Sequence, residues 1–166
     1  MMKRRIAVLL MFGALPWSQL HAQSQTAEAT FRVSTRVNAV CSVTASNLDF
    51  GVYATQTASP KQASTVLRAT CTPGTTYQLG LNEGTTAGAT VTQRKLVSAS
   101  NATLNYQLYS DSARSVIWGN TPGTDTVTGL PGTGLAQDYT VFGSIPPSQA
   151  APAEEFGDTI TVRIYY

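Results

Sequence analysis

The sequence predicts an all-β protein built as an antiparallel sandwich. Three observations carry this prediction: short segments alternate between apolar and polar residues, turn-forming residues separate these segments, and no window beyond residue 22 shows a helical period. Alternation with a period of two is typical of strands that bury one face. Short alternating strands with turn signals between them indicate an antiparallel sandwich.

Residues 1–22 are predicted to be a signal peptide and are excluded from the fold. They combine a positive start at residues 3–5, an apolar run at residues 6–15 and a small residue, Ala22, before the expected cleavage. The apolar run is too short to span a bilayer. The alternative is a short buried helix, which leaves the basic start unexplained. We therefore expect an exported chain that does not insert into a membrane.

The charge of the mature chain excludes several functions. Without residues 1–22, eight Lys and Arg residues remain against nine Asp and Glu residues, which gives a net charge of −1. No basic cluster is left to neutralise phosphates, so we expect no nucleic-acid partner. The single histidine, His21, is removed too, and with it the usual Ser-His and Cys-His nucleophile systems. We expect no enzyme activity, no cofactor and no metal site.

The two cysteines predict one disulfide bond. Cys41 and Cys71 both remain in the mature chain, and an oxidising compartment outside the cytoplasm favours their pairing. A metal site would need more ligands than two thiols, and the mature chain offers no imidazole. The bond would close a loop of about 31 residues and stabilise the fold by roughly 3.5–4 kcal/mol in the loop-entropy account.

The first predicted strand, residues 31–43, is too long for the domain. Six of its seven odd positions are apolar and five of its six even positions are polar, as in a strand with one buried face. Thirteen extended residues span roughly 43 Å, whereas a domain of this size is only about 38 Å across. Part of the segment is therefore expected to project, with an apolar face that needs a partner.

Further strands are predicted in order along the chain from the same alternation. They are residues 47–53, 65–71, 77–81, 94–97, 101–109, 115–118 (an edge piece), 139–145 and 158–166. Loops are expected at residues 55–63, which contain Pro60, and at residues 148–157, and the Gly-rich residues 119–134 are expected to be loop or hairpin-rich. In the last strand, one face carries Ile160, Val162, Ile164 and Tyr166.

These elements resemble the spore coat protein U-like family, which includes subunits of archaic chaperone–usher pili. The resemblance covers nearly the whole mature chain. Its most specific piece is the sequence Leu-Asn-Tyr-Gln-Leu-Tyr-Ser-Asp at residues 104–111, followed by Arg114. The other matching pieces are the arm before Cys41, residues 48–51, residues 70–72, residues 141–146, Gln149 and residues 158–162. The chain departs from the family's pattern at residues 154–158, which affects a loop and not the strand scheme.

The resemblance implies an incomplete immunoglobulin-like sandwich that lacks its final strand and is completed by donor-strand complementation. Residues 23–40 would form an N-terminal donor-strand arm and residues 41–166 a pilin-like domain. The implied donor residues are Phe31, Val33, Thr35, Val37 and Ala39. The implied groove, which also binds the chaperone, lies beside Ile160, Val162, Ile164 and Tyr166. The hinge is expected between Val37 and Cys41.

The function that this resemblance implies is that of a structural subunit of a surface fibre, either a pilus or a spore or cell coat. The expected partners are other subunits in a homo- or hetero-polymer, a periplasmic chaperone and an outer-membrane usher. Export would run through the periplasm to the cell surface, where the fibre would support adhesion and biofilm formation. Pairing of the arm within its own domain is the structural alternative. The alternative function is a self-contained secreted sandwich that binds a polysaccharide or host surface through aromatic residues such as Trp118.

Overall fold

The computed structural model describes residues 25–166, and the predicted signal peptide at residues 1–22 lies outside them. The chain divides into two units, Met1–Thr35 and Arg36–Tyr166. In the first unit, residues 25–35 form no strand or helix, and their side chains are exposed. None of the described residues belongs to a helix long and apolar enough to cross a membrane.

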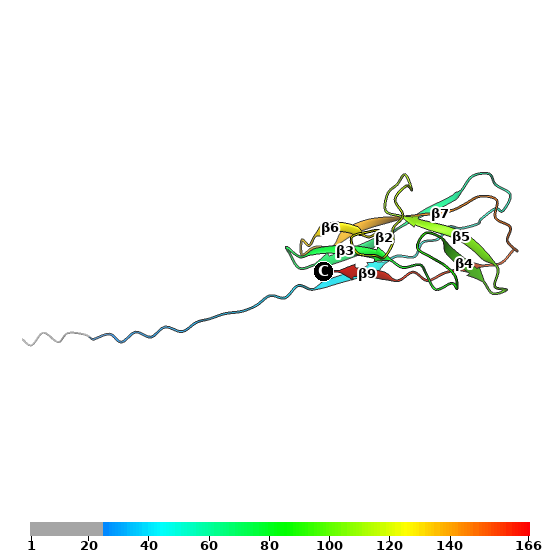
Figure 1. Ribbon diagram of the computed structural model, residues 1–166. Helices are drawn as coiled ribbons and strands as arrows, with labels where there is room; N and C mark the ends of the chain where they lie inside the picture. Colours follow the sequence, from blue (N-terminus) through cyan, green and yellow to red (C-terminus); the bar gives the residue numbers. More distant parts are fainter. Residues whose placement is uncertain (1–24) are drawn as a thin grey trace, which may run out of the picture. The chain divides into compact units, whose positions relative to one another are not determined.

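The second unit is an antiparallel β-sandwich with two sheets, so the predicted fold class is confirmed (Figure 1). One sheet has six strands in the order β1-β2-β7-β5-β4-β8, and the other has three in the order β6-β3-β9. The strands are β1 (Cys41–Ala45), β2 (Lys61–Cys71), β3 (Thr76–Leu81), β4 (Arg94–Ser98), β5 (Thr103–Tyr109), β6 (Val127–Pro131), β7 (Gln137–Ile145), β8 (Phe156–Gly157) and β9 (Val162–Tyr165). No helix occurs among residues 25–166.

Strands β2 and β7 form the longest ladder of the larger sheet. They are its longest strands and pair over nine positions, from Lys61 opposite Ile145 to Ala69 opposite Gln137. Their buried residues are all apolar or Gly and alternate along each strand. On the outward face, Arg68 lies opposite Asp138 and binds its carboxylate with two hydrogen bonds of 2.7 and 2.9 Å.

The predicted disulfide between Cys41 and Cys71 is present. The two residues lie directly opposite each other in the β1–β2 ladder, with 4.2 Å between their Cα atoms. Val40, the residue before Cys41, is also bonded to the domain: its carbonyl accepts a 3.0 Å hydrogen bond from the amide of Thr72. The chain is therefore fixed to the domain from Val40 onward.

Residues from both sheets form the core. Its buried members include Leu67, Ala69, Tyr77, Leu79, Leu81, Leu108, Trp118, Val141 and Ile145. Trp118 is only 1% exposed, and its indole nitrogen donates a 2.8 Å hydrogen bond to the carbonyl of Leu79. The sequence-based suggestion that Trp118 offers a surface for sugar stacking is therefore wrong, because the ring packs between the sheets.

Several predicted segment assignments need correction. The segment at residues 31–43 is strand only from Cys41, and residues 31–40 belong to no strand. Residues 47–53 form no ladder either, since pairing with β2 ends after Ala45 and a last bond from the Ser46 amide to Val66. The remaining differences concern segment ends and short strands. β2 begins at Lys61, β8 lies in a predicted loop, residues 115–118 contribute one bridge at Ile117, and the last strand is limited to Val162–Tyr165. β6 lies in the segment predicted to be loop or hairpin-rich.

Candidate functional site

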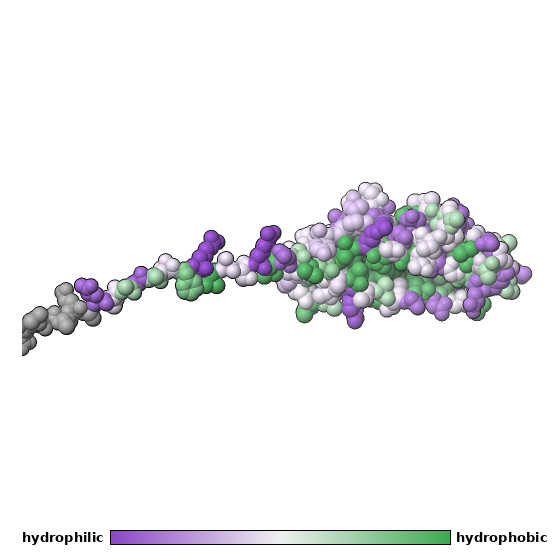
Figure 2. Space-filling view, turned by 90° about the horizontal axis from the view of Figure 1, so that it is seen from below, coloured by the Kyte–Doolittle hydropathy of each residue, from purple (hydrophilic) through white to green (hydrophobic). Residues whose placement is uncertain are grey.

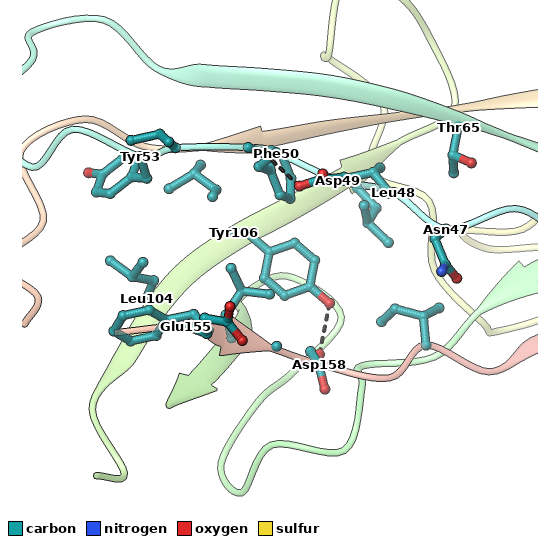
Figure 3. Close-up of a pocket in the computed structure, with 18 of the residues that line it drawn as sticks. Asn47, Leu48, Asp49, Phe50, Tyr53, Thr65, Leu104, Tyr106, Glu155 and Asp158 are labelled. Atoms are coloured by element: carbon teal, nitrogen blue, oxygen red, sulfur yellow. Dashed lines mark hydrogen bonds between the residues drawn. The ribbon is translucent and has the colours of Figure 1, made fainter. Parts of the chain in front are cut away.

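A groove of about 1560 Å³ opens along one side of the sandwich. One wall is the segment that follows β1, residues 45–56, and the other is the segment that leads into β9, residues 151–162. Figure 3 shows these two segments facing each other across the space, with side chains from both pointing into it. The groove therefore lies where the two sheets separate.

The floor of the groove is formed by apolar residues that belong to the hydrophobic core or pack against it. It is lined by Leu67, Leu81, Leu96, Leu104, Tyr106, Leu108, Val141 and Ile145. Seen from below, the domain carries a hydrophobic band along its length (Figure 2). A continuous apolar band on the surface of a small domain commonly marks an interaction site. The floor can accept apolar side chains.

The first wall is held over the sheet by Leu48 and Phe50. Phe50 packs edge-on against Tyr106, with 6.2 Å between the ring centroids. Both side chains lie over Gly143 of β7, where an added Cβ would come within 2.7 Å of the Phe50 ring and 3.0 Å of Leu48. The absence of a side chain at Gly143 therefore lets the wall approach the sheet closely.

Tyr53 fixes the far end of this wall. Its hydroxyl donates a 2.8 Å hydrogen bond to the carbonyl of Pro146 and accepts one of 3.1 Å from the amide of Gln149. The side chain of Gln149 in turn bonds both backbone groups of Asn105 on β5, at 2.8 and 2.9 Å. These bonds connect the wall to two other segments without closing the groove.

Asp158 holds the second wall. Its Oδ2 accepts a 2.7 Å hydrogen bond from the hydroxyl of Tyr106, drawn as a dashed line in Figure 3. Its Oδ1 accepts bonds of 2.8 Å from the amide and 3.0 Å from the hydroxyl of Thr85. Burial, followed by the bond to Asp158, raises the pKa of Tyr106, so this hydroxyl remains a donor at neutral pH.

Two edge strands each reach the groove at one residue, Ala45 of β1 and Val162 of β9. β1 is an outer strand of the six-stranded sheet, and β9 is an outer strand of the three-stranded sheet. β9 pairs with β3 through Gln78–Leu81 on one side only. An outer strand offers free amide and carbonyl groups to a further strand. The site thus combines an apolar floor with a strand edge that can accept main-chain hydrogen bonds.

The predicted groove residues do not all lie in the groove. Ile160 and Val162 line it, as the sequence indicates. Ile164 packs against the core without lining the groove, and Tyr166 follows the end of β9 and is 63% exposed. The residues predicted from the sequence for the groove include none of the floor and none of the first wall. The motif at residues 104–111 was a signal for the floor, but its role depends on contacts across the sandwich.

The predicted donor residues can be described only within the arm itself. Phe31 and Val33 are 88% and 82% exposed, and Val37 is 78% exposed. Thr35 and Ala39 are exposed too, and residues 25–40 contain no strand. The donor role of these five residues stays a prediction.

The fold and the groove define a class of protein, an antiparallel β-sandwich with an apolar cleft open along a sheet edge. Comparison with known proteins identifies the family. The Spore Coat Protein U domain matches residues 27–163, and the chain belongs to this family. Protein U of Myxococcus xanthus is 31% identical over 161 residues, which cover 87% of this chain and 88% of that protein. The resemblance seen in the sequence is confirmed.

A solved structure shares the fold. It is the crystal structure of the CsuC-CsuE chaperone-tip adhesion subunit pre-assembly complex from archaic chaperone-usher Csu pili of Acinetobacter baumannii, with a TM-score of 0.57 and 24% identity. The match covers 78% of this chain and 40% of the chain in that structure. At this identity the likeness is one of fold.

Proposed function

We propose that this chain is a structural subunit of an exported surface fibre, a pilus or a coat, that polymerises by donor-strand complementation. The observation that carries the proposal is the groove of about 1560 Å³ beside the β9 edge, together with an arm whose apolar side chains are exposed. Residues 23–40 are the donor arm and residues 41–166 the domain that receives an arm. Residues 1–22 direct export in this proposal.

The energetics of an extended apolar arm favour such an exchange. Ten extended residues, 31–40, span about 33 Å. Burial of Phe31, Val33 and Val37, with Ala39 beside them, contributes roughly 5–10 kcal/mol before the cost of ordering the arm. An added strand also forms main-chain hydrogen bonds with a sheet edge. Because the arm and the groove are different surfaces, the contact repeats head to tail and builds a filament instead of a closed dimer.

The same groove accounts for the other proposed partners. An apolar cleft beside a free strand edge promotes aggregation before assembly. A periplasmic chaperone that lends a strand would cover it, and an outer-membrane usher would replace that strand by the arm of the next subunit. The fibre at the cell surface would then serve adhesion and biofilm formation.

Removal of the arm tests this proposal. A chain without residues 23–37 is expected to bind the chaperone, because its groove is intact, and to form no fibres in electron micrographs. Val33→Asp places a charge on the apolar face of the arm, and Arg32→Asp is the matched control on the opposite face. Fibre yield should fall much further for Val33→Asp. Fibres of normal length from the truncated chain would refute donor-strand assembly.

A self-contained binding module is the competing function. Trp118, which motivated it, is buried, so this candidate loses its main support. Size-exclusion chromatography of the mature chain without a chaperone separates the two functions. The fibre subunit should elute as oligomers or aggregate, and a binding module as a stable monomer.

A further inference from the structure

The charged residues that line the groove are all acidic. They are Asp49 on the first wall and Glu154, Glu155 and Asp158 on the second. No Lys or Arg occurs among the described residues that line it. The mature chain is close to neutral, with eight basic and nine acidic residues, so this arrangement is a local excess of one sign.

The donor segment carries the opposite charge. Residues 31–40 contain Arg32 and Arg36 and no Asp or Glu. Both arginines occupy even positions, whereas Phe31, Val33 and Val37 occupy odd positions. In an extended strand the two sets point to opposite sides, so apolar side chains that enter a groove leave both arginines facing outward toward its rim.

The groove carboxylates have no cationic partner within the described chain. The ion pair formed by residues 25–166 is Arg68–Asp138, which joins β2 to β7 and uses none of the four groove carboxylates. The carboxylate of Asp158 already accepts hydrogen bonds from Tyr106 and Thr85. Asp49, Glu154 and Glu155 are exposed at the rim, and hydrogen bonds from Ser98 and Ser100 lower the pKa of Glu154 and keep it charged.

We propose that the acidic rim of the groove selects the arm of a second copy of this chain, through attraction of Arg32 and Arg36 to Asp49, Glu154 and Glu155. This inference rests on the proposed function and adds to it the identity of the partner. The two arginines lie about 13 Å apart in an extended arm, so they reach different parts of the rim. Carboxylates on both walls give each arginine a partner.

The attraction acts on the rate of assembly and on the choice of partner more than on fibre stability. Ion pairs exposed to water add little to affinity because solvent and salt screen them. Complementary charges do accelerate encounter and disfavour partners of the wrong sign. The apolar side chains of the arm therefore hold the fibre together, while the charges decide which arm enters and how quickly.

Charge reversal on the arm is the first test. Arg32→Glu combined with Arg36→Glu should slow fibre growth of the full mature chain about tenfold or more at low salt, measured by light scattering. Lys61→Glu combined with Lys95→Glu makes the same change in net charge outside the groove, and should leave the rate within about twofold. Growth of the unaltered chain should slow as salt is added, and growth of the Arg32→Gln/Arg36→Gln chain should respond far less.

The second test restores the attraction with both signs exchanged. Asp49→Lys and Glu155→Lys, added to the chain with the glutamate arm, should recover most of the rate, which also shows that the altered chains fold. In a mixture of two fluorescent labels, this exchanged chain and the unaltered chain should sort into separate fibres. Mixed fibres, or no recovery in the exchanged chain, would overturn the inference.

These outcomes separate this inference from the proposed function. If removal of residues 23–37 abolishes fibres while charge reversal changes neither rate nor sorting, donor-strand assembly stands and charge selection is wrong. If fibres persist without the arm, both fail. If fibres grow only when a different purified subunit supplies the arm, assembly by donor strand stands and the second copy is not the partner.

Discussion

The hydroxyl of Tyr106 lies 2.7 Å from Oδ2 of Asp158, and this hydrogen bond joins strand β5 of one sheet to the segment that enters β9 of the other. Both residues line the groove. Tyr106 also supports Phe50 of the opposite wall through an edge-on ring contact. One tyrosine therefore positions both walls of the groove.

Replacing Tyr106 by Phe removes this connection and keeps the ring. A buried hydrogen bond to a charged group stabilises a protein by about 1.5–3 kcal/mol, so Tyr106→Phe should lower the free energy of unfolding by this amount in urea titrations. Tyr109→Phe is the matched control on the same strand, because the Tyr109 hydroxyl makes no hydrogen bond among the described residues. Its effect should stay within about 0.5 kcal/mol. Equal losses in the two variants would contradict the role of Asp158.

The stability of the domain should fall in alkali. Burial raises the pKa of both Tyr106 and Tyr77 above the ordinary value, helped by hydrogen bonds with Asp158 and Tyr139. In the unfolded chain both tyrosines lose a proton near pH 10, while in the folded chain they keep it. The folded state then holds more protons, so its stability is complete below about pH 10 and decreases as the pH rises toward the raised pKa values.

Urea titrations at about pH 8 and about pH 11 measure this loss, which approaches about 1.4 kcal/mol per pH unit for each tyrosine. Tyr106→Phe and Tyr77→Phe should each flatten the dependence, and the double variant should flatten it most. An identical alkaline slope in the unaltered chain and the double variant would show that other groups cause the loss.

The sequence predicts the fold well where a strand pairs with neighbours on both sides. In β5, the alternation of Leu104, Tyr106 and Leu108 agrees with their burial, because each lies on the inward side of a paired strand. The same alternation at residues 47–53 led to a wrong strand assignment. There Leu48 and Phe50 do pack against the core, but Val52 is 87% exposed and no neighbouring strand supplies hydrogen bonds.

The groove itself could be predicted only in part. The alternation puts Ile160 and Val162 on one face, and the family resemblance implies that this face borders a groove. The site also needs Asp158 to meet Tyr106, which stands 52 residues earlier. The buried role of Arg94 was not predicted either, because its hydrogen-bond partners are also distant in the sequence. Arg94 looks like an ordinary strand residue, and only the folded chain brings five carbonyl oxygen atoms around it. Local periodicity contains no information about such long-range polar contacts.

Gly84 lies directly against the carboxylate of Asp158 on the second wall, and no larger residue fits there. Its φ of +97° is unfavourable for other residues, and an added Cβ would collide with the Asp158 carboxylate. Gly123 has a φ of +74° but open space around it, so Gly123→Ala measures the backbone cost alone, about 1–2 kcal/mol. Gly84→Ala should cost at least about 1 kcal/mol more, because the carboxylate must move from its partners. Equal losses in thermal unfolding would place the whole effect in the backbone.

Arg94 is expected to be essential for the core although it is charged. Its side chain is 0% exposed and donates to the carbonyls of Leu81, Asn82, Val91 and Trp118 and to the amide oxygen of Gln107, at 2.6–3.1 Å. Arg94→Met leaves these acceptors buried without donors and should cost about 3 kcal/mol or more. Arg94→Lys keeps the charge but not the planar fork, and should recover only part of the loss. Lys95→Met, at the next position, is the control and should change stability little.

The disulfide should matter most where the arm joins the domain. Cys41–Cys71 closes a 30-residue separation directly after Val40, whose amide and carbonyl both bond Thr72. Replacement of both cysteines by Ser should lower the free energy of unfolding by roughly 3–4 kcal/mol, because the unfolded chain regains its freedom. Under reducing conditions the unaltered chain should lose nearly the same free energy of unfolding, which distinguishes loss of the disulfide from any other effect of the Ser side chains.

In the proposed fibre, force on the arm reaches the domain through Val40, so fibres of the cysteine-free chain should also dissociate at lower denaturant concentration. Unchanged fibre dissociation with weakened monomers would mean that β1 bears the load through its ladder with β2 alone.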